Sequence, residues 1–172
     1  MRIKHIILDL DETLVHAVPF KELAAAGRAP FGDFKYHVFD QYVIFERPHL
    51  AEFLRALSAQ YTISVWTAAS ESYAHFIVDN ILAPLVSRPI PVVLHSAHCQ
   101  KSRALTGILK HLDILYEAPP GAPKYKRGDT ILVDDNPGVL AQNSMVIQIA
   151  PFLLKRGDDE LARVAEKIAR IK

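Results

Sequence analysis

The stretch IKHIILDLDET, residues 3–13, decides the fold class of this chain. Its first part is short, β-branched and almost continuously apolar, which is typical of a strand buried on both faces of a parallel sheet. Its second part places two carboxylates, Asp9 and Asp11, directly after that strand. Because open parallel sheets bind ligands at the carboxyl ends of their strands, the stretch predicts a ligand site in this turn.

Further apolar runs predict four more strands, at residues 61–67, 91–95, 130–134 and 145–149. Helical patterns occupy residues 48–60, 70–85 and 158–171. Pro48 suits a first helical turn, Ser70 is the expected N-cap of the second helix, and Pro84 should end or kink that helix. Strands that alternate with helices predict an α/β fold with a doubly wound, mostly parallel, Rossmann-like sheet.

One segment departs from this pattern. Residues 34–46 carry two aromatic and β-branched arms around Phe39, Asp40 and Gln41, which predicts an antiparallel hairpin. We expect this hairpin in a small insertion at about residues 14–46, and the sequence leaves no room for a large cap domain. Residues 118–128, rich in proline, glycine and basic side chains, should form a surface loop. The length of 172 residues fits one domain.

The charge balance excludes some partners. A formal net charge of +1 gives no overall positive field, so we expect neither stable nucleic-acid binding nor membrane binding. Cys99 is the only cysteine, which favours a reducing compartment. The acidic residues at positions 9–12 interrupt the first apolar run too early for a signal peptide or a membrane span, so the expected location is cytoplasmic or nuclear.

A second pair of carboxylates, Asp134 and Asp135, ends the strand at residues 130–134. Together with Asp9 and Asp11 it would gather like charges at one sheet edge, where they repel each other unless a divalent cation neutralises them. Oxygen ligands favour Mg²⁺. An isolated pair such as Asp9 and Asp11 more often only caps a turn, so the interpretation depends on its context.

Two further groups would suit an anion at the same edge. Thr67 ends the strand at residues 61–67 and precedes a helix, so its hydroxyl and the following backbone N–H groups can hold a phosphate. Lys110 would add an ammonium group. Taken alone, however, Thr67 or Ser70 is an ordinary helix cap and Lys110 a solvated helix lysine.

Five motifs in order resemble one family. The chain resembles the haloacid dehalogenase superfamily and, more narrowly, the small phosphatases that act on the C-terminal domain of RNA polymerase II, the NLI-interacting-factor-like phosphatases. The matching pieces are DLDETLVH at 9–16, ERPHLAEFL at 46–54, VWTAASESYA at 65–74, GILKHL at 107–112 and VDDNP at 133–137.

The resemblance implies a role for each matching residue. Asp9 corresponds to the nucleophile that becomes an aspartyl phosphate, and Asp11 to the general acid and base. Lys101 is a weaker alternative to Lys110 as the third-motif lysine, and Asp135 stands where the family often has an asparagine. The implied phosphate-binding residues are Thr13, Thr67, Ala68 and Lys110, and the implied Mg²⁺ ligands are Asp9, Asp11, Asp134 and Asp135.

The expected function is therefore Mg²⁺-dependent hydrolysis of phosphomonoesters, with phosphoserine or phosphothreonine on a protein or peptide as the substrate. An open cleft suits such a substrate, and the aromatic residues of the hairpin would supply an apolar wall, unless they only pack the hairpin on the sheet. These aromatic residues are Phe34, Tyr36, Phe39, Tyr42 and Phe45. The alternatives are a small-molecule or polynucleotide 3′-phosphatase and a non-catalytic phosphopeptide-binding module of the same fold.

Overall fold

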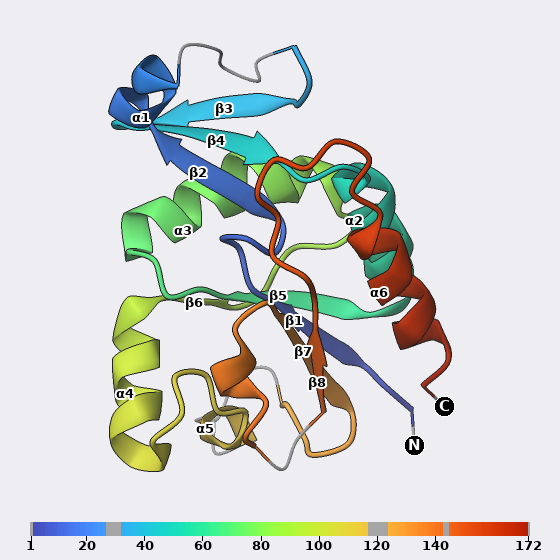
Figure 1. Cartoon of the computed structure of the whole chain (residues 1–172). Coiled ribbons are helices and arrows are strands. Elements are labelled where there is room, and N and C mark those ends of the chain that lie inside the picture. Colours follow the sequence, from blue (N-terminus) through green and yellow to red (C-terminus); the bar gives the residue numbers. More distant parts are fainter. Residues whose placement is uncertain (1, 27–31, 117–123, 143–144, 172) are drawn as a thin grey trace.

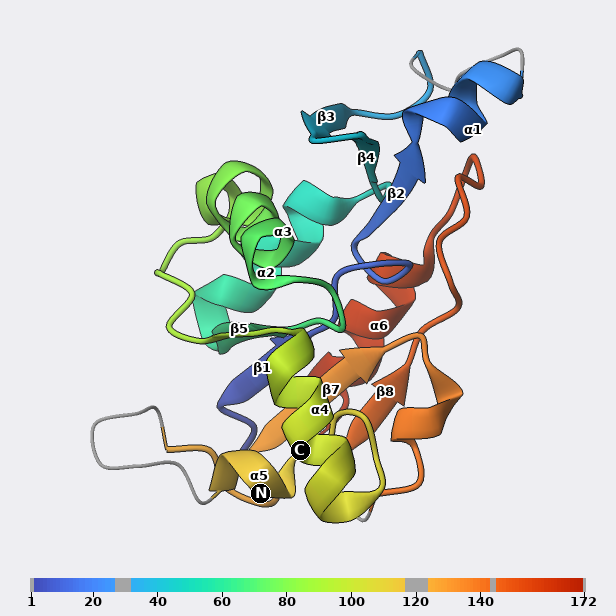
Figure 2. The same cartoon turned by 90° about the vertical axis from the view of Figure 1, so that its left-hand side faces the viewer.

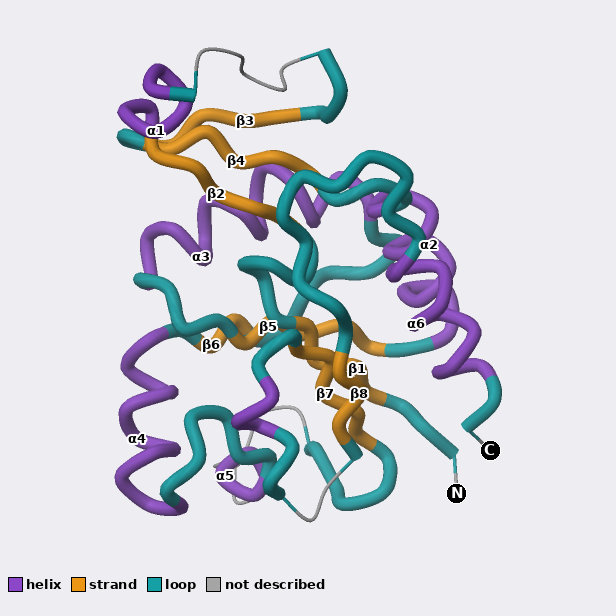
Figure 3. The backbone as a smooth tube through the Cα atoms, viewed as in Figure 1, coloured by secondary structure: helices purple, strands orange, loops and turns teal. Residues whose placement is uncertain are grey.

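A computed structural model of the chain describes residues 2–26, 32–116, 124–142 and 145–171. Its centre is a sheet of five parallel strands in the order β6-β5-β1-β7-β8 (Figures 1 and 3). The five strands predicted from the apolar runs all form, although only β7 has the predicted bounds. The strands are β1 (His5–Leu8), β5 (Thr62–Trp66), β6 (Val93–Leu94), β7 (Thr130–Asp134) and β8 (Val146–Gln148).

Helices cover both faces of this sheet, so the doubly wound α/β fold is confirmed. Ile6 and Leu8 of β1 point into one core with α2 (Leu50–Gln60), α3 (Glu71–Ile77) and α6 (Glu160–Ala169). Ile7 points into a second core with α4 (Ser96–Thr106) and α5 (Asp113–Tyr116). Figure 2 shows the two helical layers on opposite sides of the strands. Both faces are apolar, which is why β1 has a continuous and not an alternating pattern.

The helices differ from the predictions in detail. The Ser70 hydroxyl accepts a hydrogen bond from the Tyr73 N–H at 3.4 Å, which confirms the predicted cap. The segment at 70–85 is not one α-helix, because a π-helix (Val78–Leu82) and a 3₁₀-helix (Ala83–Leu85) follow α3. Helix α2 begins two residues after Pro48, since His49 has a φ of 67°. Helix α4 was not predicted, because only Cys99 and Ser102 of its residues are buried and its apolar stripe is weak.

A second, smaller sheet follows the first turn of the chain. Its antiparallel strands have the order β2-β4-β3, with β2 (Val15–Pro19), β3 (Tyr36–Phe39) and β4 (Tyr42–Glu46). The predicted hairpin is present as β3 and β4, with Asp40 in its turn at a φ of 51°. Strand β2 was not predicted, because His16 and Pro19 break its apolar pattern. Helix α1 (Phe20–Ala25) follows β2 directly.

The remaining segments complete the description. A short 3₁₀-helix (Pro137–Val139) follows β7. Most of the loop predicted at 118–128 lies outside the described residues, which resume at Lys124. No helix within the described ranges is long and apolar enough to cross a membrane.

Candidate active site

The turn after β1 is a tight loop held by backbone hydrogen bonds. The N–H groups of Thr13, Leu14 and Val15 all donate to the carbonyl of Leu10, at 3.2, 2.8 and 3.1 Å. The Asp9 N–H donates to the Val133 carbonyl of β7 at 3.0 Å. This network fixes Asp9 at the carboxyl edge of the sheet, beside the end of β7.

A lysine and two aspartates meet at this edge. The Lys110 Nζ donates to Asp9 Oδ1 at 2.5 Å and to Asp134 Oδ2 at 2.7 Å. All three side chains are buried, with 2% of Lys110, 6% of Asp9 and none of Asp134 exposed. Residues 101 positions apart in the chain are therefore in direct contact. Lys101, the alternative third-motif lysine, lies on the exposed side of α4.

Burial controls the charges in this cluster. It raises the pKa of Asp9 to about 8, with the attraction of Lys110 opposing the rise and the repulsion of Asp134 adding to it. Burial acts in the opposite sense on Lys110, but Asp9 and Asp134 outweigh it and hold the pKa of the ammonium above its ordinary value. When all three groups are ionised, the two carboxylates and one ammonium leave a net charge of −1 in this cluster.

A third carboxylate lies within reach of the first two. One oxygen from each of Asp9, Asp134 and Asp135 lies within 4.8 Å of the other two. The hydroxyl of Thr13 lies 3.3 Å from Asp9 Oδ2 and 3.3 Å from Asp135 Oδ1, and its single proton can serve only one of them at a time. Thr13 is fully buried, so its hydroxyl contacts these carboxylates from the protein interior.

Asp11 faces a different set of partners. The Tyr73 hydroxyl donates to Asp11 Oδ1 at 2.5 Å, and the Thr67 hydroxyl lies 3.5 Å from Oδ2. Burial raises the pKa of Asp11, while the bond from Tyr73 partly opposes that rise. The side chain of Asp11 does not belong to the group of Asp9, Asp134 and Asp135.

The predicted site residues other than Thr13 line one cavity of about 310 Å³. Thr67 Oγ1 accepts the Ala69 N–H at 3.0 Å, which orients the loop before α3. Among the described residues, no hydrogen-bond partner is found for the Ala68 N–H, which therefore remains available to an anion. The residues around this cavity are Asp9, Asp11, Glu12, Thr67, Ala68, Leu109, Lys110, Asp134, Asp135, Asn136 and Pro137.

A buried glutamine, Gln142, holds Lys110 in position. The sequence did not predict this role. Gln142 Nε2 donates to the carbonyls of Lys110 and Val139, and its Oε1 accepts the N–H of Leu112, at 2.8 to 2.9 Å. Lys110 lies in a turn between α4 and α5 and not on a helix, so it needs such support. A lone glutamine in a polar stretch carries no signal that would have revealed this role.

Arg47 supports the loop of Asp9 and Asp11 from the other side. Its guanidinium donates to both oxygens of Asp158 at 2.7 and 2.9 Å and to the carbonyls of Thr13 and Ala150 at 2.9 and 2.8 Å. A weaker contact reaches the Glu12 carbonyl at 3.3 Å. The guanidinium is fully buried. Arg47 lies in the matching piece at 46–54, but no local pattern points to its partner 111 residues later.

The chain is similar to several known proteins. A putative CTD phosphatase-like protein 355R of Invertebrate iridescent virus 6 is 34% identical over 166 residues, covering 91% of this chain and 90% of that protein. The structure of Fcp1, described as an essential RNA polymerase II CTD phosphatase, superposes with a TM-score of 0.60 at 21% identity. That match covers 96% of this chain but 49% of the Fcp1 chain, so this chain spans about half its length.

A HAD-like hydrolase has the same fold. A predicted HAD-like family hydrolase from Porphyromonas gingivalis superposes over the full length of both chains with a TM-score of 0.55 at 12% identity. At such low identities the two structural matches establish the fold alone. The family model described as NLI interacting factor-like phosphatase matches residues 4–172. This chain therefore belongs to the NLI interacting factor-like phosphatase family.

Proposed function

We propose that this protein hydrolyses phosphoserine or phosphothreonine on protein substrates, with Mg²⁺ as its cofactor and Asp9 as a covalent nucleophile. One observation carries the proposal: the buried carboxylate of Asp9 lies in a cavity whose lining includes Lys110, Thr67 and Ala68. Such a cavity has a cation, a hydroxyl and an N–H group for phosphate oxygens, and one carboxylate for the phosphorus.

The donor set fits Mg²⁺. Asp9, Asp134 and Asp135 supply only oxygen atoms, and these lie close enough together to share one ion. The raised pKa of Asp9 supports the same proposal, because without a further positive charge the nucleophile is partly protonated near neutral pH. When bound, Mg²⁺ would supply the charge that keeps Asp9 ionised and that screens the phosphate oxygens.

The chain's own residues then divide the reaction into two steps. A carboxylate oxygen of Asp9 attacks phosphorus as the bond to the leaving oxygen breaks, and Asp11 gives that oxygen a proton. Asp11 next takes a proton from the water that attacks the phosphoryl group on Asp9, which releases phosphate and restores both carboxyl groups. The raised pKa of Asp11 suits the first role, since the acid must start protonated.

The shape of the chain around the cavity favours a macromolecular substrate. Between β1 and α2 the described residues form only the small sheet and the six-residue helix α1. A small metabolite needs a cap to exclude water, whereas a protein segment covers the cavity itself. Of the hairpin aromatics, Phe39 and Tyr42 line an adjoining pocket, while Phe34 and Phe45 are buried in the core of the small sheet.

Asp9→Asn tests the chemistry. It should abolish hydrolysis of p-nitrophenyl phosphate and phosphopeptides while circular dichroism and melting remain those of a folded protein. Asp79→Asn, which removes an exposed carboxylate outside the cavity, is the matched control. Activity of Asp9→Asn near that of the unmodified protein would exclude Asp9 as the nucleophile. Beryllium fluoride with Mg²⁺ should bind at Asp9 as a phosphoryl mimic.

A substrate panel tests the class of substrate. Phosphoserine and phosphothreonine peptides should have a higher kcat/KM than sugar phosphates, nucleotides or a 3′-phosphorylated oligonucleotide. A tenfold preference for a small metabolite, about 1.4 kcal/mol of discrimination, would overturn the protein substrate but not the phosphatase chemistry. Tight phosphopeptide binding without any turnover would identify a binding module instead.

A further inference from the structure

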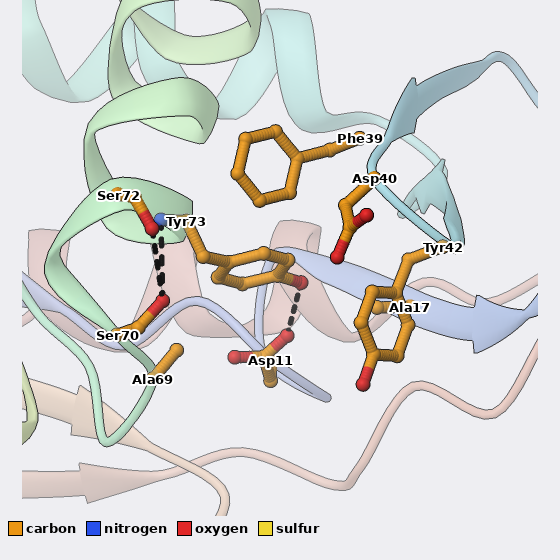
Figure 4. Close-up of a pocket in the computed structure, with 9 residues that line it drawn as sticks. All are labelled: Asp11, Ala17, Phe39, Asp40, Tyr42, Ala69, Ser70, Ser72 and Tyr73. Carbon is orange, nitrogen blue, oxygen red and sulfur yellow. Dashed lines mark hydrogen bonds between the residues drawn. The ribbon is translucent and has the colours of Figure 1, made fainter.

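A second pocket adjoins the candidate active site. It has a volume of about 470 Å³ and lies between the small sheet and the start of α3 (Figure 4). The two cavities meet at Asp11, which lines both. A side chain in this pocket would therefore belong to a residue close to the phosphorylated one. The lining residues are Asp11, Ala17, Phe39, Asp40, Tyr42, Ala69, Ser70, Ser72 and Tyr73.

Aromatic rings form much of its wall. Phe39 comes from β3, Tyr42 from β4 and Tyr73 from α3, so three separate elements contribute a ring. The rings of Phe39 and Tyr73 meet edge to face with centroids 5.9 Å apart. Phe76 packs behind Phe39 at 4.7 Å, which holds that ring in place. An aromatic wall attracts apolar groups and also cations, because a ring face carries negative charge density.

The charge of the lining is one-sided. Its ionisable side chains are the carboxylates Asp11 and Asp40 and the two tyrosines, with no lysine, arginine or histidine. Asp11 already accepts the hydroxyl of Tyr73. Asp40 lies exposed at the hairpin turn, and within the described ranges no ion pair or hydrogen bond is found for its carboxylate. Figure 4 shows this carboxylate directed over the space between Tyr42 and Tyr73.

A backbone role alone does not require this charge. The φ of 51° at Asp40 favours aspartate or asparagine, because both tolerate the left-handed region. Asparagine would satisfy the turn equally well. The two roles can therefore be separated, since Asp40→Asn keeps the turn and removes only the negative charge.

We propose that this pocket binds a lysine or arginine side chain of the phosphoprotein, within a few residues of the phosphorylated side chain. The cationic head would lie beside Asp40 and against the rings of Tyr42 and Tyr73, and its aliphatic stem would cover Phe39. The inference rests on the proposed function for its substrate class. It adds a requirement that the chemistry of Asp9 does not contain: basic residues near the phosphorylation site.

Binding of a phosphoserine peptide series tests the pocket directly. In each peptide one of the three positions on either side of phosphoserine is lysine, and a partner peptide has the neutral norleucine there. Fluorescence anisotropy should give a Kd about five- to tenfold lower for lysine at one or two positions. Asp40→Asn should remove most of that advantage, whereas the control Asp79→Asn should preserve it. Raising the salt to about 0.5 M should weaken the advantage in the unmodified protein.

The outcomes separate this proposal from the phosphatase chemistry. Equal affinity for lysine and norleucine at every position, tighter binding of norleucine, or no peptide binding would overturn it. An advantage that Asp40→Asn leaves intact would overturn it too. Hydrolysis of p-nitrophenyl phosphate, measured in the same samples, tests Asp9 separately and should be unchanged by Asp40→Asn. A lysine advantage in a protein without turnover would support the pocket and contradict the proposed function.

Discussion

Replacing Arg47 should destabilise the whole chain and not only its active site. In Arg47→Met the five hydrogen bonds of the guanidinium are lost, and Asp158, only 5% exposed, is left as an unpaired buried charge. Breaking a buried pair in this way costs about 3 to 5 kcal/mol. Because a domain of this size has a total stability of about 5 to 15 kcal/mol, the loss is a large fraction of it.

Urea unfolding measures this loss. Trp66 is the only tryptophan and is fully buried, so its fluorescence follows global unfolding without an added probe. Linear extrapolation should give the loss in the free energy of unfolding at an unchanged slope. Arg163→Met is the matched control, because its side chain is 68% exposed and pairs only at the surface, where such pairs contribute about 0 to 1 kcal/mol.

A double-mutant cycle tests whether the loss of stability comes from the pair of Arg47 and Asp158. Asp158→Asn alone should also destabilise, and the double variant Arg47→Met with Asp158→Asn should lose less than the sum of the two single losses, since it leaves no unpaired charge. A loss below about 1 kcal/mol for Arg47→Met, or losses that simply add, would refute the reasoning. At temperatures where Arg47→Met is folded, its kcat should fall, because the carbonyls of Glu12 and Thr13 lose their anchor.

Three further predictions concern the site. Tyr73→Phe should lower kcat with little change in stability. The hydrogen bond from Tyr73 lowers the pKa of Asp11, so its removal should raise that pKa and move the alkaline limb of the pH profile to higher pH. An unmoved limb would contradict this. Mg²⁺ at a hundredfold excess over its Kd should add about 2.7 kcal/mol, or about 5 to 10 °C in Tm, and Asp134→Asn should abolish most of that shift. Gln142→Ala should cost about 3 kcal/mol in urea unfolding, since three buried backbone groups lose their partner, and should raise KM by loosening Lys110; a loss under about 0.5 kcal/mol would exclude this support.

Much of the fold follows from local patterns in the sequence. The run at 130–134 predicts β7 to the residue, because all five of its residues are buried and the apolar signal is continuous. Strand β2 and helix α4 could not be predicted in the same way. Only Val15 of β2 is buried, and the ladder of β2 with β4 depends on residues 23 to 31 positions later in the chain. In both elements long-range contacts outweigh the local pattern.

The site was predictable to a similar degree. Motif order and the rule for strand ends brought Asp9, Lys110 and Asp134 to one place, and the structure has them in contact. The sequence could not reveal which groups hold them. Gln142 lies 32 residues from Lys110, with no pattern linking the two, and the bond from Tyr73 to Asp11 depends on how α3 packs over the turn. Supporting hydrogen bonds of this kind are a property of tertiary packing.

Strand β4 connects the second pocket to the loop of Asp9 and Asp11. One end of β4 continues from the turn that carries Asp40, and the other leads directly into Arg47. Its partner β2 continues the loop of Asp9 and Asp11, and the Arg47 N–H donates to the Leu14 carbonyl at 3.0 Å. The position of Asp40 relative to Asp9 is thus set by a hydrogen-bonded ladder and one buried guanidinium. If the two proposals hold, a substitution in the hairpin turn should change which neighbouring side chain is bound without moving Asp9, whereas a substitution at Arg47 should disturb both.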